Sequence, residues 1–349
     1  MNSLEDWKQE YRLLKEFVSA HPEIVVNPSE ISIPQDLRDE FYRYFDNIRR
    51  AVVRDNFSAL PSEIGLLRDR FVQIEKEIVA LLHLERISMP LDLYSFLHSP
   101  EEGLIRALYN RTFDLIQGKI GADEFEKHAR DALHASAEFF YRLGYEWWAA
   151  LAIIKLLDPD EIYRVDFDDD YELVLAEMKE ICFGRQAHHP TKRIPEFVVR
   201  SRKIDQYVAV KMALAQELQT FSVSIKPPVR PRKKTGDTSL ALDSRVMLLS
   251  FMESKEKIPV LADIYECTLI HPHWMIEYVA GKELGDPAVM DEVRHHSASL
   301  KPILGTCLVL IDPDDEADLG DMPENIRPVV AGFDQSKLLA AIDELPITT

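Results

Sequence analysis

The sequence predicts an α+β protein, in which an all-α N-terminal helical bundle or array is followed by a small α/β-type C-terminal domain. Apolar residues recur at helical spacing through the first 222 residues. A proline- and lysine-rich stretch without apolar periodicity follows at 223–240. Short aliphatic runs bounded by proline, aspartate and glycine then occupy 241–349, mixed with helix-like pieces. We therefore predict a helical domain at 1–222, a linker at 223–240 and a mixed α/β domain at 241–349.

Composition and charge narrow the classes of protein to which the chain can belong. The 349 residues are 46% hydrophobic and 29% charged, which is typical of a globular protein. The net charge is −19, from 60 acidic and 41 basic residues, so bulk attraction to nucleic acid or anionic lipid is not expected. The longest apolar run, Trp147–Leu157, is shorter than the about 20 residues of a membrane span. The N-terminus has no signal-peptide pattern and the three cysteines are widely spaced, which predicts a cytoplasmic protein with reduced thiols and no membrane contact.

Stripes of apolar residues spaced by three and four predict the helices of the first region. The stripe from Ile64 to Leu81 has the heptad spacing of an antiparallel helix pair or a short coiled coil. Ser99-Pro100 starts a helix with a capping serine and a first-turn proline, and Gly118 is expected to end it. Trp147–Leu157 is apolar on nearly all sides, which predicts the most buried helix. Further helices are predicted from Leu4, after Pro34, from Phe125 to Leu143, at 170–182 and at 195–221.

The C-terminal domain is predicted to mix short strands with short helices. Its aliphatic and β-branched runs are bounded by turn-forming residues, as strands of small α/β domains are. Strands are predicted at 246–251, 258–261, 267–270, 307–311 and 328–331, and helices at 273–280, 287–297 and 335–345.

A cluster of cysteine and histidine residues in this domain is a candidate metal site. Thiolate and imidazole are the ligands that zinc prefers, and zinc takes four of them. The spacing matches neither a paired C-x-x-C motif nor H-E-x-x-H, so buried cysteines and loop histidines are the alternative interpretation. No cofactor is predicted from sequence motifs, and zinc is the metal that this cluster would suit. The candidate ligands are Cys267, His271, His273, His295 and His296.

The basic linker is a candidate contact for nucleic acid. Its side chains can reach phosphates, and Arg200, Arg202 and Lys203 of the predicted helix at 195–221 can extend the same patch. No aromatic residue for base stacking lies between them, and the rest of the chain is acidic, so a solubilising linker is the alternative. The candidate residues are Lys226, Arg230, Arg232, Lys233 and Lys234.

The acidic residues from Asp166 to Glu177 follow the spacing of a calcium-binding loop. Tyr171 occupies the position where that loop needs glycine. We therefore interpret the stretch as the acidic start of the helix predicted at 170–182.

These observations predict a non-enzymatic protein-interaction or scaffold protein, with a protein partner or self-association. The heptad-spaced stripe from Ile64 to Leu81 and the dense aromatic residues of the helical region favour it. The first alternative is a metal-dependent hydrolase that uses the Cys/His cluster. The second is a nucleic-acid accessory factor that uses the arm at 226–234.

Overall fold

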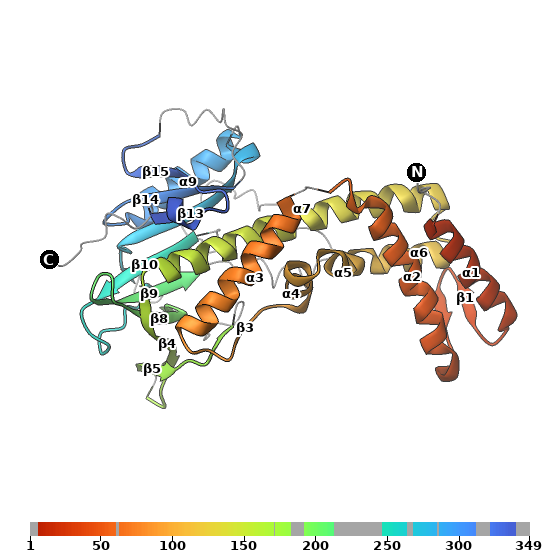
Figure 1. Ribbon diagram of the computed structural model, residues 1–349, viewed down its shortest axis with the longest axis horizontal. Helices are drawn as coiled ribbons and strands as arrows, with labels where there is room; N and C mark the ends of the chain where they lie inside the picture. Colours follow the sequence, from red (N-terminus) through yellow and green to blue (C-terminus); the bar gives the residue numbers. More distant parts are fainter. Residues whose placement is uncertain are drawn as a thin grey trace. The chain divides into compact units, whose positions relative to one another are not determined.

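A computed structural model confirms the α+β class, with helices first and a sheet-rich region after them (Figure 1). It describes residues 6–60, 63–170, 172–182, 192–212, 246–263, 268–284, 286–311 and 322–339. The chain divides into two compact units. Unit 1 comprises Met1–Asp69 and Leu91–Tyr141, and unit 2 comprises Arg70–Pro90 and Arg142–Thr349.

Unit 1 is helical apart from one short hairpin. Its core contains large apolar side chains from several helices, and the rings of Trp7 and Phe125 lie 4.9 Å apart. Its elements are α1 (Asp6–Ala20), β1 (Val25–Asn27), β2 (Glu30–Ser32), η1 (Gln35–Leu37), α2 (Arg38–Phe57), α4 (Leu91–His98), α5 (Pro100–Ile105), η2 (Arg106–Leu108) and α6 (Tyr109–Ile116), together with the first parts of α3 (Glu63–Leu81) and α7 (Ala122–Leu156).

Two of the predicted helix boundaries in unit 1 are confirmed. Helix α5 begins at Pro100 directly after Ser99, and the helical segment ends before Gly118, whose φ of 69° is readily adopted by glycine. The segment is broken by the 3-10 turn η2, so three short helical pieces replace the single predicted helix.

The heptad-spaced stripe of α3 is buried within the chain. Ile64, Leu67, Phe71, Ile74 and Ile78 are each at most 2% exposed. This stripe is therefore core, and it does not provide the exposed helix face that a coiled-coil partner would need.

Unit 2 is built around an eight-stranded mixed sheet. The strand order is β15-β14-β13-β10-β9-β8-β4-β5, in which β13, β14 and β15 are parallel and the other neighbours antiparallel. The strands of the sheet are β4 (Pro159–Phe167), β5 (Leu173–Glu177), β8 (Phe197–Ser201), β9 (Gln206–Met212), β10 (Val246–Met252), β13 (Trp274–Ala280), β14 (Thr306–Ile311) and β15 (Ile326–Val330). Smaller sheets pair β3 (Arg86–Ser88) with β6 (Glu180–Cys182), and β7 (Lys192–Arg193) with β11 (Ala262–Asp263) and β12 (Thr268–Leu269).

Helices cover both faces of this sheet. Helix α9 (Pro287–Leu300) packs Val293 against Val279 of β13 and Leu308 of β14. The preceding residue of β13, Tyr278, points to the opposite face, where it lies near Tyr145 of α7. The apolar run is fully buried from Trp147 to Ile154 and at Leu157, which confirms the prediction that it forms the most buried helical segment. The unit also contains η3 (Gly281–Glu283) and α10 (Gln335–Leu338).

The helices predicted at 170–182, 195–221 and 273–280 are wrong. The first range contains β5 and β6, the second contains β8 and β9, and the third is β13. The change from helix to sheet therefore lies between α7 and β4, near residue 157, and not near 222. The acidic stretch after Asp166 is correspondingly a hairpin turn, in which Asp168 Oδ1 accepts hydrogen bonds from the backbone of Asp170 and Glu172.

The sheet also joins residues on either side of the predicted linker. Strand β9 pairs with β10 along six residues, so the segments before and after 223–240 belong to one sheet. The linker itself lies outside the described residues.

The predictions for the C-terminal region are confirmed in part. The predicted strands at 246–251, 307–311 and 328–331 correspond to β10, β14 and β15, and the predicted helix at 287–297 to α9. Within the described ranges, no helix combines the length and apolarity needed to cross a membrane.

Candidate functional site

The histidines of the predicted metal site do not converge. His271 Nδ1 lies 2.8 Å from the backbone oxygen of Leu300, and His295 is exposed on α9. His296, one residue further on, is buried. Over the part of the chain that the structure describes, no three His, Cys, Asp or Glu side chains are grouped so that they could hold a metal ion. Cys267 lies outside the described residues.

Two of these histidines have specific structural partners. The backbone N–H of Phe251 donates to Nδ1 of His273, and burial lowers the pKa of this imidazole. His296 Nδ1 lies 3.2 and 3.3 Å from the two carboxylate oxygens of Glu277. That pair links α9 to β13 inside unit 2, and both side chains are almost fully buried. The contacts hold each ring in a fixed orientation within the fold.

The five candidate residues for nucleic-acid binding, Lys226 to Lys234, lie outside the described residues. Of the residues expected to extend that patch, Arg200 pairs with Asp205 at 2.6 Å and Arg202 pairs with Asp158 at 2.5 Å. They lie on or beside β8, not on a helix, and these two charges are locally balanced by carboxylates.

A cluster of aromatic side chains in unit 1 reaches the surface. We call Tyr42 and Phe45 of α2, with Tyr109 and Phe113 of α6, the aromatic patch. Tyr42 is 37% exposed and Tyr109 is 43% exposed, whereas Phe45 beneath them is fully buried. The patch therefore presents two tyrosine rings on a base that belongs to the core.

The rings of the patch pack in the geometries that aromatic pairs prefer. The ring centroid of Phe45 lies 5.9 Å from Tyr42, 5.4 Å from Tyr109 and 4.5 Å from Phe113. Tyr109 and Phe113 lie one helical turn apart on α6, with centroids 4.9 Å apart. These contacts restrict the orientation of the two tyrosine rings.

A buried arginine lies within the aromatic patch. The Arg49 guanidinium carbon lies 4.8 Å from the ring centroid of Phe45 and 5.3 Å from that of Tyr109. The same guanidinium forms an ion pair with Asp46, one turn earlier on α2. Since Asp46 balances the charge, the patch presents aromatic surface without a net charge at its base.

The hydroxyl of Tyr109 is perturbed by its position in the patch. Burial raises the pKa of the phenol, and the neighbouring Tyr42 raises it further. The two tyrosine rings are linked through Phe45, which contacts both.

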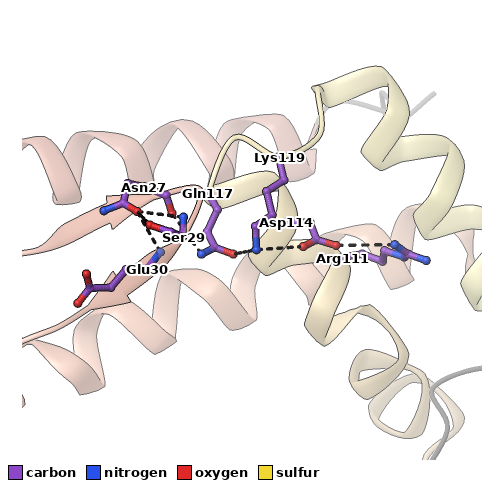
Figure 2. A network of polar contacts seen from close by, with 7 residues as sticks. All are labelled: Asn27, Ser29, Glu30, Arg111, Asp114, Gln117 and Lys119. Atoms are coloured by element: carbon purple, nitrogen blue, oxygen red, sulfur yellow. Dashed lines mark hydrogen bonds and ion pairs between the residues drawn. The ribbon is translucent and has the colours of Figure 1, made fainter.

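A polar network fixes the end of α6, the helix that carries half of the patch (Figure 2). Gln117 Nε2 donates to the backbone oxygen of Asn27 at the end of β1. Lys119 Nζ donates to Gln117 Oε1 at 2.8 Å and lies 3.9 Å from Asp114. Asp114 also pairs with Arg111 at 3.7 Å. The network ties α6 to the β1–β2 hairpin.

Sequence analysis did not find this patch. The helix predicted after Pro34 is present as α2 with Phe45 on its buried face, but Tyr42 lies off that face and Tyr109 follows the helix break at η2. The available signal is an aromatic residue on the polar side of an amphipathic helix, as Tyr42 is on α2.

No protein-family model, curated protein sequence or solved structure shows a significant match to the chain.

Proposed function

We propose that this protein acts by binding another protein, as an interaction or scaffold protein, and that the aromatic patch of unit 1 is a contact surface. The observation that carries the proposal is the pairing of two substantially exposed tyrosines with a buried base of Phe45 and Arg49. Tyrosine and arginine are enriched among the residues that dominate binding energy at protein interfaces.

The physical argument is preorganisation. A free surface tyrosine loses rotamer freedom when a partner orders it, which reduces the affinity. Tyr42 and Tyr109 are already packed against Phe45, so they can bury aromatic area on binding at a small entropic cost. The patch is also uncharged at its base, which favours a partner surface that is apolar with hydrogen-bonding groups at its rim.

The test compares the variant Tyr42→Ser/Tyr109→Ser with Tyr94→Ser. Tyr94 is an equally exposed tyrosine of unit 1 that stacks on His98 of α4, outside the patch. Purified full-length chains are used to capture proteins from a lysate of the source cells, and captured proteins are identified by mass spectrometry. Binding of each purified partner is then measured by calorimetry.

We expect the patch variant to lose binding by at least about tenfold, because an interface tyrosine of this kind contributes more than about 1 kcal/mol. The Tyr94→Ser chain should bind like the wild type. Equal binding by all three chains would exclude the patch as the contact surface. Failure of the wild-type chain to bind any protein, or itself in sedimentation equilibrium, would exclude the proposed function.

The two alternative functions stay predictions. The metal-dependent hydrolase requires Cys267, and the nucleic-acid accessory factor requires the arm at 226–234; both lie outside the described residues.

A further inference from the structure

The eight-stranded sheet of unit 2 has two edge strands that differ in how they are protected. Strand β15 lies at one edge and β5 at the other. Edge strands carry backbone N–H and C=O groups that can pair with another chain, and proteins usually block them with proline, charge or a covering segment. The hydrogen-bond register of each edge strand determines which of its backbone groups face outward.

Strand β15 is blocked by a proline. The N–H of Thr306 donates to the backbone oxygen of Asn325, so in the parallel ladder Arg327 and Val329 bond to β14. The nitrogen of Pro328 therefore faces the open side of the strand, where it has no hydrogen to donate. A strand added at this edge would lose its central hydrogen bond.

Strand β5 has no such block. The N–H of Asp168 donates to the backbone oxygen of Glu172, so Val174 and Ala176 are the residues of β5 that bond to β4. The N–H and C=O groups of Leu173, Leu175 and Glu177 consequently point away from the sheet. Among the ranges that the structure describes, no strand pairs with this side of β5.

The side chains around the β5 edge specify what could pair with it. Leu173 and Leu175 are half-buried and pack on the cluster around Val165. The stretch 168–177 contains five acidic residues, all exposed, and no basic residue. The edge is therefore apolar along its length, with four acidic residues at its N-terminal end and Glu177 at its C-terminal end, where the exposed Lys179 follows.

We propose that the β5 edge binds an extended segment of a partner protein, with alternating apolar side chains and Lys or Arg at its ends, which adds a strand to the sheet. This inference rests on the proposed function and names a second surface and the chemistry of its partner. Backbone hydrogen bonds supply the pairing, and opposite charge at the ends supplies selectivity. A second copy of the chain is disfavoured as the occupant, because it would bring two acidic stretches together.

The test uses a fluorescent synthetic peptide of alternating valine and threonine, flanked by lysine and arginine. Two matched peptides are compared with it: one flanked by glutamate, and one N-methylated at the backbone positions that would face β5. The protein is tested as wild type, Glu177→Pro and Glu177→Gln. Proline removes the outward N–H together with the charge, whereas glutamine removes only the charge. Glu177 is exposed and its backbone does not bond to β4, so β5 should keep its place in the sheet.

Anisotropy titrations should show binding of the basic peptide that weakens as salt is added. Glu177→Gln should weaken this binding a few-fold, and Glu177→Pro at least about threefold further, because one backbone hydrogen bond is lost. The acidic and N-methylated peptides should bind at least about tenfold more weakly.

Binding that Glu177→Pro and N-methylation leave unchanged would overturn the proposal, as would no binding at millimolar peptide. A wild-type dimer that Glu177→Pro dissociates in sedimentation would assign the edge to a second copy and overturn it too. The chain with Tyr42→Ser/Tyr109→Ser should bind the peptide like the wild type. The result for β5 is therefore independent of the test of the aromatic patch.

Discussion

Two aromatic clusters in this molecule have similar ring packing but differ in solvent exposure. In unit 2, Tyr145 and Trp148 of α7 pack with Phe333, with ring centroids 5.2 to 5.4 Å apart. In unit 1, the aromatic patch has similar ring spacings. Tyr145 and Trp148 are fully buried, whereas the tyrosines of the patch are 37% and 43% exposed.

The difference separates two uses of the same residue type. A ring that is fully buried contributes the whole of its apolar area and its contacts to the folding free energy. A partly exposed ring contributes less to the folding free energy, and its exposed apolar surface can be buried by a binding partner. Substitutions in the unit 2 cluster should therefore change stability, and substitutions in the patch should change binding.

The largest expected effect is that of Trp148→Ala. Removing a buried indole leaves a cavity and should lower the free energy of unfolding by about 3–5 kcal/mol. Tyr109→Ala in the patch should lower it by only about 1 kcal/mol, because almost half of the ring already contacts solvent. Urea denaturation monitored by circular dichroism measures both. Equal losses for the two variants would remove the distinction between the clusters.

Alkaline pH gives a second way to separate the two regions. Burial raises the pKa of Tyr278, near Tyr145, well above its ordinary value, and raises the pKa of Tyr109 in the patch. A raised folded-state pKa means that the stabilisation is fully present below about pH 10, the unfolded value, and is lost as the pH rises toward the folded value. Because Tyr278 is fully buried, the free energy of unfolding should fall by up to about 1.4 kcal/mol for each pH unit above about pH 10.

The variant Tyr278→Phe should therefore lose less stability than the wild type between pH 10 and 11, as measured by urea midpoints. Its neutral-pH stability should change little, since the hydroxyl donates to the Met247 sulfur, a weak acceptor, at 3.6 Å. Tyr109→Phe should flatten the same pH profile less. A Tyr278→Phe profile that runs parallel to the wild type would contradict the assignment.

The contrast between the regions also explains which parts of the fold could be predicted from sequence. Helix α2 and the stripe of α3 each bury one face, so their apolar spacing indicates helix directly. Strand β13 is buried from Trp274 to Val279, and β9 from Val208 to Met212. A strand buried on both faces has no alternation of apolar and polar residues, so its sequence also fits a buried helix.

The candidate site was less accessible to sequence analysis than the fold. Whether Tyr42 and Tyr109 come together depends on how α6 docks on α2, and that is set by contacts such as Gln117 to Asn27, 90 residues apart in sequence. His271 and His273 precede β13, whereas His295 and His296 lie on α9, and His271, His273 and His296 each contact a different partner. The histidines were therefore predicted as one site because they are close in sequence. The aromatic patch was not predicted because its residues are far apart in sequence.

The smallest expected effects come from removing single hydroxyl groups. Tyr145 donates to the backbone oxygen of Gly332 at 2.5 Å, so Tyr145→Phe should lower the free energy of unfolding by about 1 kcal/mol. Tyr42→Phe should change the free energy of unfolding by less than about 0.5 kcal/mol, because the side chain of Tyr42 is exposed and its hydroxyl is accessible to water. Thermal and urea denaturation of the two variants side by side gives the comparison. A Tyr42→Phe loss as large as that of Tyr145→Phe would mean that the patch is part of the folding core, and its exposed rings could then no longer be assigned to binding.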